Sequence, residues 1–268
     1  MTNERLLTSV LAFVLLPFLS GAALADIATL DHAADQEEML RQVAEQDRRI
    51  RNNPKDARAY LARGEAHFKL RDFESAIDDF THALRLNDKL DDAYFGRGMA
   101  RGRGGEIDAG IADLGVYLRR NPKSSLAYTK RGIRYLWKGD LDNAERDFRK
   151  ALALDPRNAE AHDDLGVILA QRGEYPAALK HFEATVSADP TYQKGFHNLA
   201  LVHYLTGNAA EGLTRVDQAL RLIPDARDSL LLKAAILEAL GREREAKAIK
   251  EEAEFLPQGD ASARMPLQ

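Results

Sequence analysis

The stretch SLAYTKRGIRYLWKGDLDNAERDFRKALALDPRN, residues 125–158, decides the fold. Apolar residues recur in it at three- and four-residue spacing in two runs, over 128–136 and over 141–152. Gly139 and Asp140 stand between the two runs and have the composition of a turn. Pro156 closes the stretch, because a proline lacks the amide hydrogen that a helix needs. The sequence therefore predicts two amphipathic helices joined as a hairpin.

This hairpin recurs along the chain with a period of 34 residues. Its closing proline returns as Pro54, Pro122, Pro156, Pro190 and Pro224. Six units counted from residues 57, 91, 125, 159, 193 and 227 keep four columns in phase. Position 4 is Tyr60, Tyr94, Tyr128, His162, Phe196 and Leu230; position 8 is Gly64, Gly98, Gly132, Gly166, Ala200 and Ala234; position 20 is Ala76, Gly110, Ala144, Ala178, Gly212 and Ala246; position 24 is Phe80, Leu114, Phe148, Phe182, Val216 and Lys250. Such a period is typical of stacked repeats.

The columns have a physical reason. Residues at positions 8 and 20 are small because the two antiparallel helices touch there, and larger side chains would push the backbones apart. The aromatic residue at position 24 fills the wider gap beside that contact. Because one hairpin cannot bury both of its apolar faces alone, we expect neighbouring hairpins to stack.

The unit resembles the tetratricopeptide repeat, which carries an aromatic residue, Gly, Tyr, Ala-x-x-x-Phe and Pro in this order. The third unit fits best, with Tyr128, Gly132, Tyr135, Ala144, Phe148, Ala151 and Pro156. The resemblance covers residues 35–256. It implies an all-α fold, an α-solenoid of about six helix-turn-helix repeats that form a right-handed superhelix.

The first residues differ from the repeats. Residues 1–25 combine a charged start, an apolar run over 6–19 and an Ala-x-Ala site, which is the layout of a secretory signal peptide. We expect cleavage after Ala25, export to the periplasm, and no integral membrane segment in the mature chain. An uncleaved membrane anchor is the alternative, and the short run with Pro17 argues against it.

The mature chain is expected to hold a linker with an N-terminal capping helix over 26–56 and a disordered tail over 257–268. Between them, the repeat array 57–256 divides into units 57–90, 91–124, 125–158, 159–192, 193–226 and 227–256. The second unit is the richest in glycine, with Gly102, Gly104, Gly105, Gly110 and Gly115. Because interior glycines weaken helices, we expect this unit to be the softest, either through sequence drift or as a functional hinge.

Composition and motifs argue against catalysis. The net charge is −4 with both signs interspersed, so the basic stretch expected of a nucleic-acid-binding protein is missing. The chain has no cysteine, and its histidines form no i, i+4 pair. The acidic pairs Asp78–Asp79 and Asp163–Asp164 are interpreted as solvated faces. We expect no catalytic residue, no metal and no cofactor.

Function is expected on the concave side of the solenoid. In the family that the chain resembles, positions 2, 5, 6, 9, 12 and 13 tend to face the groove. These positions mix apolar and charged residues here, which suits a peptide or a partner helix. The predicted protein-binding groove consists of Arg58, Leu61, Glu65, Phe68, Asp92, Phe95, Met99, Arg103, Thr129, Lys130, Ile133, Trp137, Asp163, Asp164, Val167, Lys194, His197, Asn198, Leu201 and Tyr204.

These observations lead to the hypothesis of a non-enzymatic scaffold or adaptor in the bacterial cell envelope. Its partner would be another envelope protein, bound through an extended peptide or a helix. The alternative is a self-assembling structural component of an envelope complex, against which the charged end helices argue. One subclass of the family binds the carboxylate tail of its partner with lysine, asparagine and arginine residues at fixed positions of three successive repeats. No three successive repeats of this chain carry that set.

Overall fold

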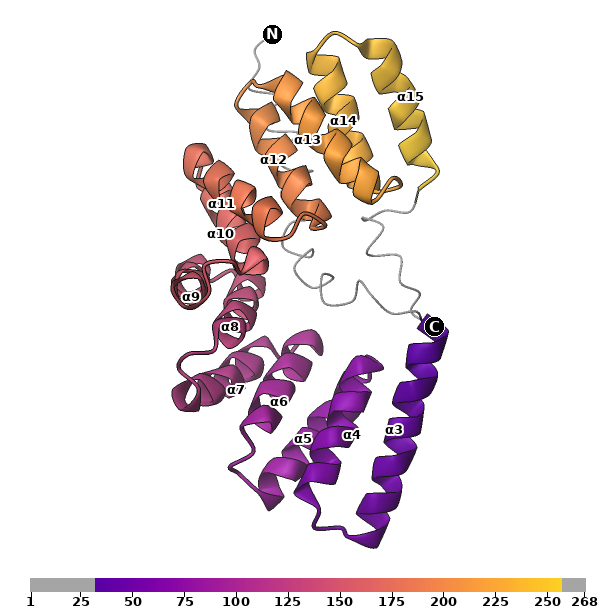
Figure 1. Ribbon diagram of the computed structural model, residues 1–268, viewed down its shortest axis with the longest axis vertical. Helices are drawn as coiled ribbons and strands as arrows, with labels where there is room; N and C mark the ends of the chain where they lie inside the picture. Colours follow the sequence, from indigo (N-terminus) through magenta and orange to yellow (C-terminus); the bar gives the residue numbers. More distant parts are fainter. Residues whose placement is uncertain (1–31, 257–268) are drawn as a thin grey trace. The chain divides into compact units, whose positions relative to one another are not determined.

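The computed structural model describes residues 32–256, and all regular elements in this range are α-helices (Figure 1). In chain order the helices are α3 (His32–Asn52), α4 (Ala57–Lys69), α5 (Phe73–Leu86), α6 (Asp91–Arg103), α7 (Ile107–Arg120), α8 (Ser125–Lys138), α9 (Leu141–Leu154), α10 (Ala159–Gln171), α11 (Tyr175–Ala188), α12 (Gln193–Leu205), α13 (Ala209–Leu222), α14 (Arg227–Ala239) and α15 (Glu243–Glu254). The all-α prediction is confirmed. The expected signal peptide with its cleavage after Ala25, and the expected disordered tail, lie outside the described residues.

The helices from α4 onward form six hairpins, and these gather into two compact units. The N-terminal unit holds α3 and the hairpins α4–α5, α6–α7 and α8–α9; the C-terminal unit holds α10–α11, α12–α13 and α14–α15. Within each unit, the second helix of one hairpin packs against the first helix of the next. Helix α3 packs against α4 at one end of the N-terminal unit. The predicted stacking of helical hairpins is thus present in both units.

Each hairpin turns at the same place in the repeat. Five of the six turns use a glycine with positive φ, at Gly105, Gly139, Gly173, Gly207 and Gly241. In the first hairpin Arg71 occupies this position and adopts φ 63°, a conformation that costs a residue with a side chain more than it costs glycine. Position 15 of the repeat therefore adopts a left-handed backbone conformation in all six hairpins, whether the residue is glycine or arginine.

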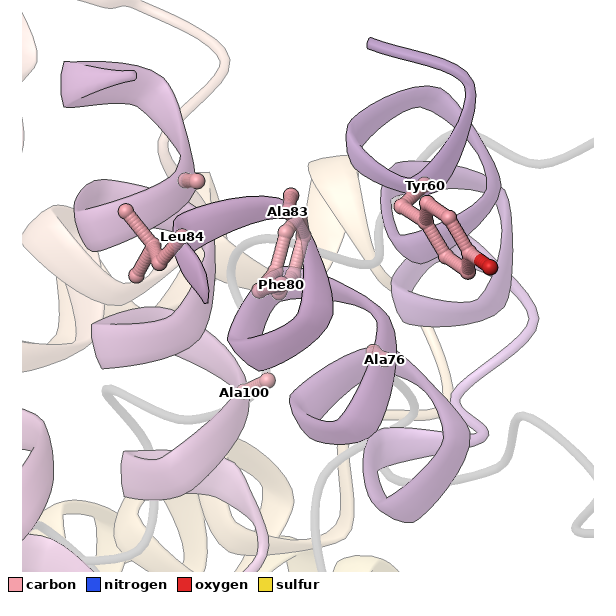
Figure 2. Packing of buried hydrophobic residues seen from close by; sticks show 7 residues of the cluster. Tyr60, Ala76, Phe80, Ala83, Leu84 and Ala100 are labelled. Carbon is pink, nitrogen blue, oxygen red and sulfur yellow. The ribbon is translucent and has the colours of Figure 1, made fainter. Parts of the chain in front are cut away.

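The core of each hairpin forms where position 8 meets position 24. A Cβ added at Gly132 would lie 2.7 Å from Cε1 of Phe148, and one at Gly166 would lie 2.6 Å from Cε1 of Phe182. The first hairpin follows the same rule, because a Cβ at Gly64 would lie 3.0 Å from Cδ1 of Phe80. Phe80 belongs to a buried cluster with Ala83 and Ala100 (Figure 2). Position 8 is small because the aromatic ring lies directly against it, rather than in a gap beside the helix contact.

Gly102 and Gly110 of the glycine-rich second hairpin lie in close packing. A Cβ at Gly110 would lie 2.8 Å from the carbonyl oxygen of Gly98 and 3.0 Å from the amide nitrogen of Gly102, so backbone faces backbone. A Cβ at Gly102 would lie 2.5 Å from Nε of Arg134, a fully buried side chain of α8. The crowding gives these glycines a packing role, which is a different reason from drift or a hinge.

Among the described helices, none has the length and apolar character that crossing a membrane requires.

Candidate protein-binding surface

The first helices of neighbouring hairpins contact one another in both units. Helices α4, α6 and α8 do so in the N-terminal unit, and α10, α12 and α14 in the C-terminal unit. All twenty residues of the predicted groove lie on five of these helices. We call the surface that the first helices form in each unit its first-helix face.

On the N-terminal first-helix face, exposure falls from α4 to α8. The exposed residues are Arg58, Glu65 and Asp92, the half-buried ones are Leu61, Phe68, Phe95, Arg103 and Trp137, and the buried ones are Met99, Thr129, Lys130 and Ile133. Glu65 lies near Asp92, and partial desolvation of its carboxyl group together with the charge of Asp92 raises the pKa of Glu65, although the residue as a whole is exposed. The exposed end of this face therefore carries carboxylates and an arginine, and the buried end carries apolar side chains beside a lysine.

The predicted residues of the C-terminal unit are more deeply buried than expected. Those below a tenth exposed are Asp163, Asp164, Val167, Asn198 and Leu201, and the half-buried ones are Lys194, His197 and Tyr204. The interpretation of Asp163–Asp164 as a solvated face is therefore wrong. It is also wrong for Asp79, which is buried while its neighbour Asp78 is exposed. In both pairs, contacts with other helices bury a carboxylate that the local sequence predicts to be exposed.

The buried Asp79 belongs to an ion pair that the first three hairpins repeat. Position 7 is arginine and position 23 is aspartate in each, and the two side chains meet between the first and second helices. The pairs are Arg63–Asp79, with Nε to Oδ2 at 2.8 Å, Arg97–Asp113 at 2.8 Å and Arg131–Asp147 at 2.7 Å, each completed by a second bond from Nη2 to Oδ1. The recurring Arg and Asp, 16 residues apart, were the sequence signal for this feature, and sequence reasoning missed it.

Further contacts make these ion pairs into networks. Asp113 also accepts a hydrogen bond from Nη1 of Arg101 at 2.7 Å. Arg63 donates to Asp47 of α3 at 2.6 Å, and its bonds to Asp79 and Asp47 raise its pKa although burial opposes the shift. Each paired arginine also lies over the tyrosine at position 4, between 5.5 and 5.7 Å from the ring centroid. These arginines are therefore structural, and they lie between the two helices of a hairpin.

The fourth hairpin replaces this network with a pair of histidines. Leu165 occupies position 7, while His162 at position 4 approaches His181 at position 23 with 2.9 Å between their Nδ1 atoms. Nε2 of His162 lies 3.1 Å from the carbonyl oxygen of Pro156. Because a carbonyl only accepts, His162 donates from Nε2, and in the neutral pair His181 donates from Nδ1. This pair joins the two helices of its hairpin.

Side-chain hydrogen bonds join neighbouring first helices in the C-terminal unit. Asn198 of α12 donates from Nδ2 to Oδ1 of Asp163 on α10 at 2.8 Å. Gln193 donates from Nε2 to the hydroxyl oxygen of Ser229 on α14 at 2.8 Å, and Nδ1 of His197 lies 2.9 Å from the same oxygen. Five polar residues of this face thus link three successive hairpins across their first helices.

The carboxyl group of Asp163 has an unusual acidity. Burial raises its pKa to about 6, while the hydrogen bonds with Asn198 and Tyr192 and the charge of Lys194 oppose the rise, and the charge of Glu160 adds to it. Desolvation therefore outweighs the polar partners, and Asp163 exchanges its proton near neutral pH.

Two aromatic side chains of the predicted groove have packing partners on one side. Phe95 packs against Tyr117 of α7 with 5.1 Å between ring centroids. Trp137 lies beneath the guanidinium group of Arg134, whose Cζ is 4.6 Å from the indole centroid. Both aromatics are half-buried, so each is held in place and still offers part of its surface.

The described residues offer no group of three or more histidine, aspartate and glutamate side chains that could hold a metal ion. The side chains of the first-helix faces supply hydrogen-bond donors, acceptors, charges and apolar surface. Protein–protein interfaces are built from such groups.

Family models for the tetratricopeptide repeat match two parts of the chain. One match covers residues 129–192 and another covers residues 57–90. The second match coincides with the first predicted unit. No curated protein matches the chain.

Solved structures of similar fold include several repeat proteins. The chain is similar to YrrB, described as a TPR protein with an unusual peptide-binding site, at 22% identity and a TM-score of 0.55, over 69% of this chain and 95% of that one. A tetratricopeptide repeat protein from Parabacteroides merdae matches at 18% identity and a TM-score of 0.63, over 84% and 94%. PilF from Pseudomonas aeruginosa matches at 15% identity and a TM-score of 0.67, over 75% and 93%. At these identities the likeness concerns the fold.

Proposed function

Since the chain is a tetratricopeptide-repeat protein, we propose that it is a non-enzymatic scaffold whose first-helix faces bind a segment of a partner protein. The observation that carries the proposal is the set of half-buried aromatic and polar side chains on these faces. Phe95 and Trp137 are each fixed from one side by a neighbour, so binding would order few additional rotamers. The peptide-binding site named for YrrB, a protein of similar fold, supports the same proposal.

The partner segment would be an extended peptide or a helix. A face that runs across three successive first helices offers contacts in a row, which suits an elongated guest better than a compact ligand. The charged residues at the exposed end of the face would select the partner, and the half-buried aromatics would contribute most of the binding energy.

The place of action that we propose is the bacterial cell envelope. The support is the signal-like sequence of residues 1–25, with its expected cleavage after Ala25. Expression in a Gram-negative host, followed by fractionation and N-terminal sequencing, tests this. A mature protein that starts at Asp26 in the periplasmic fraction is expected. A chain that keeps residues 1–25 in the cytoplasmic fraction would contradict the proposal.

A pull-down from envelope extract tests the binding function. The chain carrying Phe95→Ala together with Trp137→Ala is expected to lose partners that the wild type retains, because both half-buried anchors are removed. Tyr175→Ala is the matched control, since Tyr175 is a half-buried aromatic on a second helix, α11. Circular dichroism of each variant verifies the fold. Equal retention by all three proteins would contradict the proposal.

A further inference from the structure

We propose that Asp163 and Asn198, on the C-terminal first-helix face, together receive a lysine or arginine side chain of the bound segment. This inference rests on the proposed binding function and names the chemistry of one contact. Both receiving side chains are buried, with Asn198 3% and Asp163 5% exposed. They come from neighbouring hairpins, α10–α11 and α12–α13, so a guest that contacts both would span two repeats.

The first reason is a hydrogen-bond acceptor that lacks a donor. Oδ1 of Asn198 is buried and makes no hydrogen bond. Its orientation is fixed, because Nδ2 of the same amide donates to the carboxylate of Asp163, and a flipped amide would bring oxygen against oxygen. A buried acceptor without a donor costs free energy, and a donor brought by a partner would recover it.

The second reason is the local charge. The titratable groups that act on Asp163 are Glu160, from its own helix α10, Lys194, from α12, and Tyr192, which precedes α12 and forms a hydrogen bond with the carboxylate. Two carboxylates then face one ammonium group, so the surroundings favour a guest that brings positive charge. A guest carboxylate would meet further acceptors and would be repelled. A charged donor also makes a stronger hydrogen bond than a neutral one.

The third reason is the apolar surface beside the pair. Val167 lies one turn beyond Asp163 on α10, and Leu201 lies one turn beyond Asn198 on α12. Both are buried below a tenth exposed. The methylene groups of a lysine or arginine pack well on such surface while the cationic end reaches polar atoms. The pair and its apolar neighbours thus match both parts of a long basic side chain.

Peptide selection on the full chain tests the inference. Nonapeptides displayed on phage would be selected on immobilised wild type, Asp163→Asn and Glu183→Gln. Glu183 is the matched control because it is an exposed carboxylate on the second helix α11. Wild type and Glu183→Gln are expected to enrich lysine or arginine at one fixed position, and Asp163→Asn is expected to enrich peptides without that preference.

Affinity measurements with an enriched synthetic peptide provide a second readout. Since burial raises the pKa of Asp163 to about 6, wild type is expected to bind about tenfold more tightly at pH 7 than at pH 5, because only the ionised carboxylate attracts the cation. In Asp163→Asn this dependence is expected to disappear. Asn198→Ala is expected to weaken binding about tenfold at pH 7.

The failures can be told apart. Peptides enriched without any fixed basic position would overturn this inference and leave the proposed binding function intact, as would a basic position that persists in Asp163→Asn. Loss of affinity in Asn198→Ala with neither a basic preference nor pH dependence would indicate a neutral donor and overturn the inference. If no peptide is enriched on wild type, both this inference and the proposed function fail.

Discussion

The N-terminal and C-terminal units use the same 34-residue frame but place their buried polar side chains differently. In the N-terminal unit, Arg–Asp pairs such as Arg97–Asp113 join the two helices of one hairpin. In the C-terminal unit, hydrogen bonds such as Asn198–Asp163 join the first helices of successive hairpins. The repeat therefore specifies the apolar packing at positions 8, 20 and 24. The polar contacts between helices differ from one unit to the other.

The variation has a consequence for recognition. An arginine that is paired between two helices stabilises the fold, so under the proposed function the N-terminal face would bind through Phe95, Trp137 and its exposed charges. In the C-terminal unit position 7 is Leu165 and Leu199, and the polar side chains lie on the first-helix face itself. The sixth hairpin has Lys233 at position 7, which pairs with Asp217 at 2.8 Å in a partly exposed setting.

The largest expected effect concerns the ion pairs. Asp113→Ala leaves Arg97 and Arg101 without their shared carboxylate, and we expect it to lower the unfolding free energy by about 3–5 kcal/mol, because removing one member of a buried pair strands the other charge. Asp108→Ala on the same helix is the control: its pair with Lys138 is exposed, and its loss should cost about 0–1 kcal/mol. Urea denaturation measures both. Equal losses would contradict the structural role of the ion pairs.

The next effect should appear only in the C-terminal unit. The pKa of Asp163 is raised to about 6, so the folded state binds its proton more tightly than the unfolded chain does. The contribution of this group to the unfolding free energy therefore rises as the pH falls from about 7 toward 4, by about 1–3 kcal/mol. Asp163→Asn is expected to remove this part of the pH dependence. A pH profile of stability that is unchanged by Asp163→Asn would contradict the assigned pKa.

Glycine at position 20 offers a comparison between the units. A Cβ at Gly110 would meet backbone at 2.8 and 3.0 Å, whereas one at Gly212 would meet a backbone oxygen at 3.1 Å and a movable Cδ1 of Ile236 at 3.4 Å. We expect Gly110→Ala to cost about 1–3 kcal/mol and Gly212→Ala less. Gly115→Ala, where a Cβ meets only arginine ends at 3.7 Å or more, should stabilise by about 1 kcal/mol. Thermal melts that rank these three variants otherwise would contradict the close packing of α6 and α7.

The smallest effect concerns the turn of the first hairpin. Arg71→Gly relieves a positive φ that the other five hairpins assign to glycine, and we expect a gain of about 0.5–1 kcal/mol. Thermal denaturation measures the gain. A loss of stability would mean that the Arg71 side chain contributes more than its backbone conformation costs.

Much of the fold could be predicted from the sequence, because its causes are local and repeated. The period, the proline joints, the turn at Gly139 and the small residues at positions 8 and 20 each reflect a constraint that acts within one hairpin. The first-helix positions could be assigned for the same reason. Repetition made these local signals visible even in a single sequence.

The polar interior could not be predicted, because it depends on contacts between helices. Nothing near Asp163 in the sequence indicates that Asn198, 35 residues later, donates to it. His162 and His181 are 19 residues apart and meet only when their hairpin closes. The Arg–Asp columns were visible, yet alternating charges on amphipathic helices are ordinarily solvated, and only the packed hairpin buries them.

Photo-crosslinking would show whether partners bind on the first helices. A photoreactive amino acid would be placed at exposed or half-exposed first-helix positions, Arg58, Asp92 and Lys194, and at exposed second-helix positions, Asp78, Arg119 and Glu183. Crosslinks to the same partner are expected from the first set and none from the second. Crosslinks from the second helices, with none from the first, would contradict this expectation.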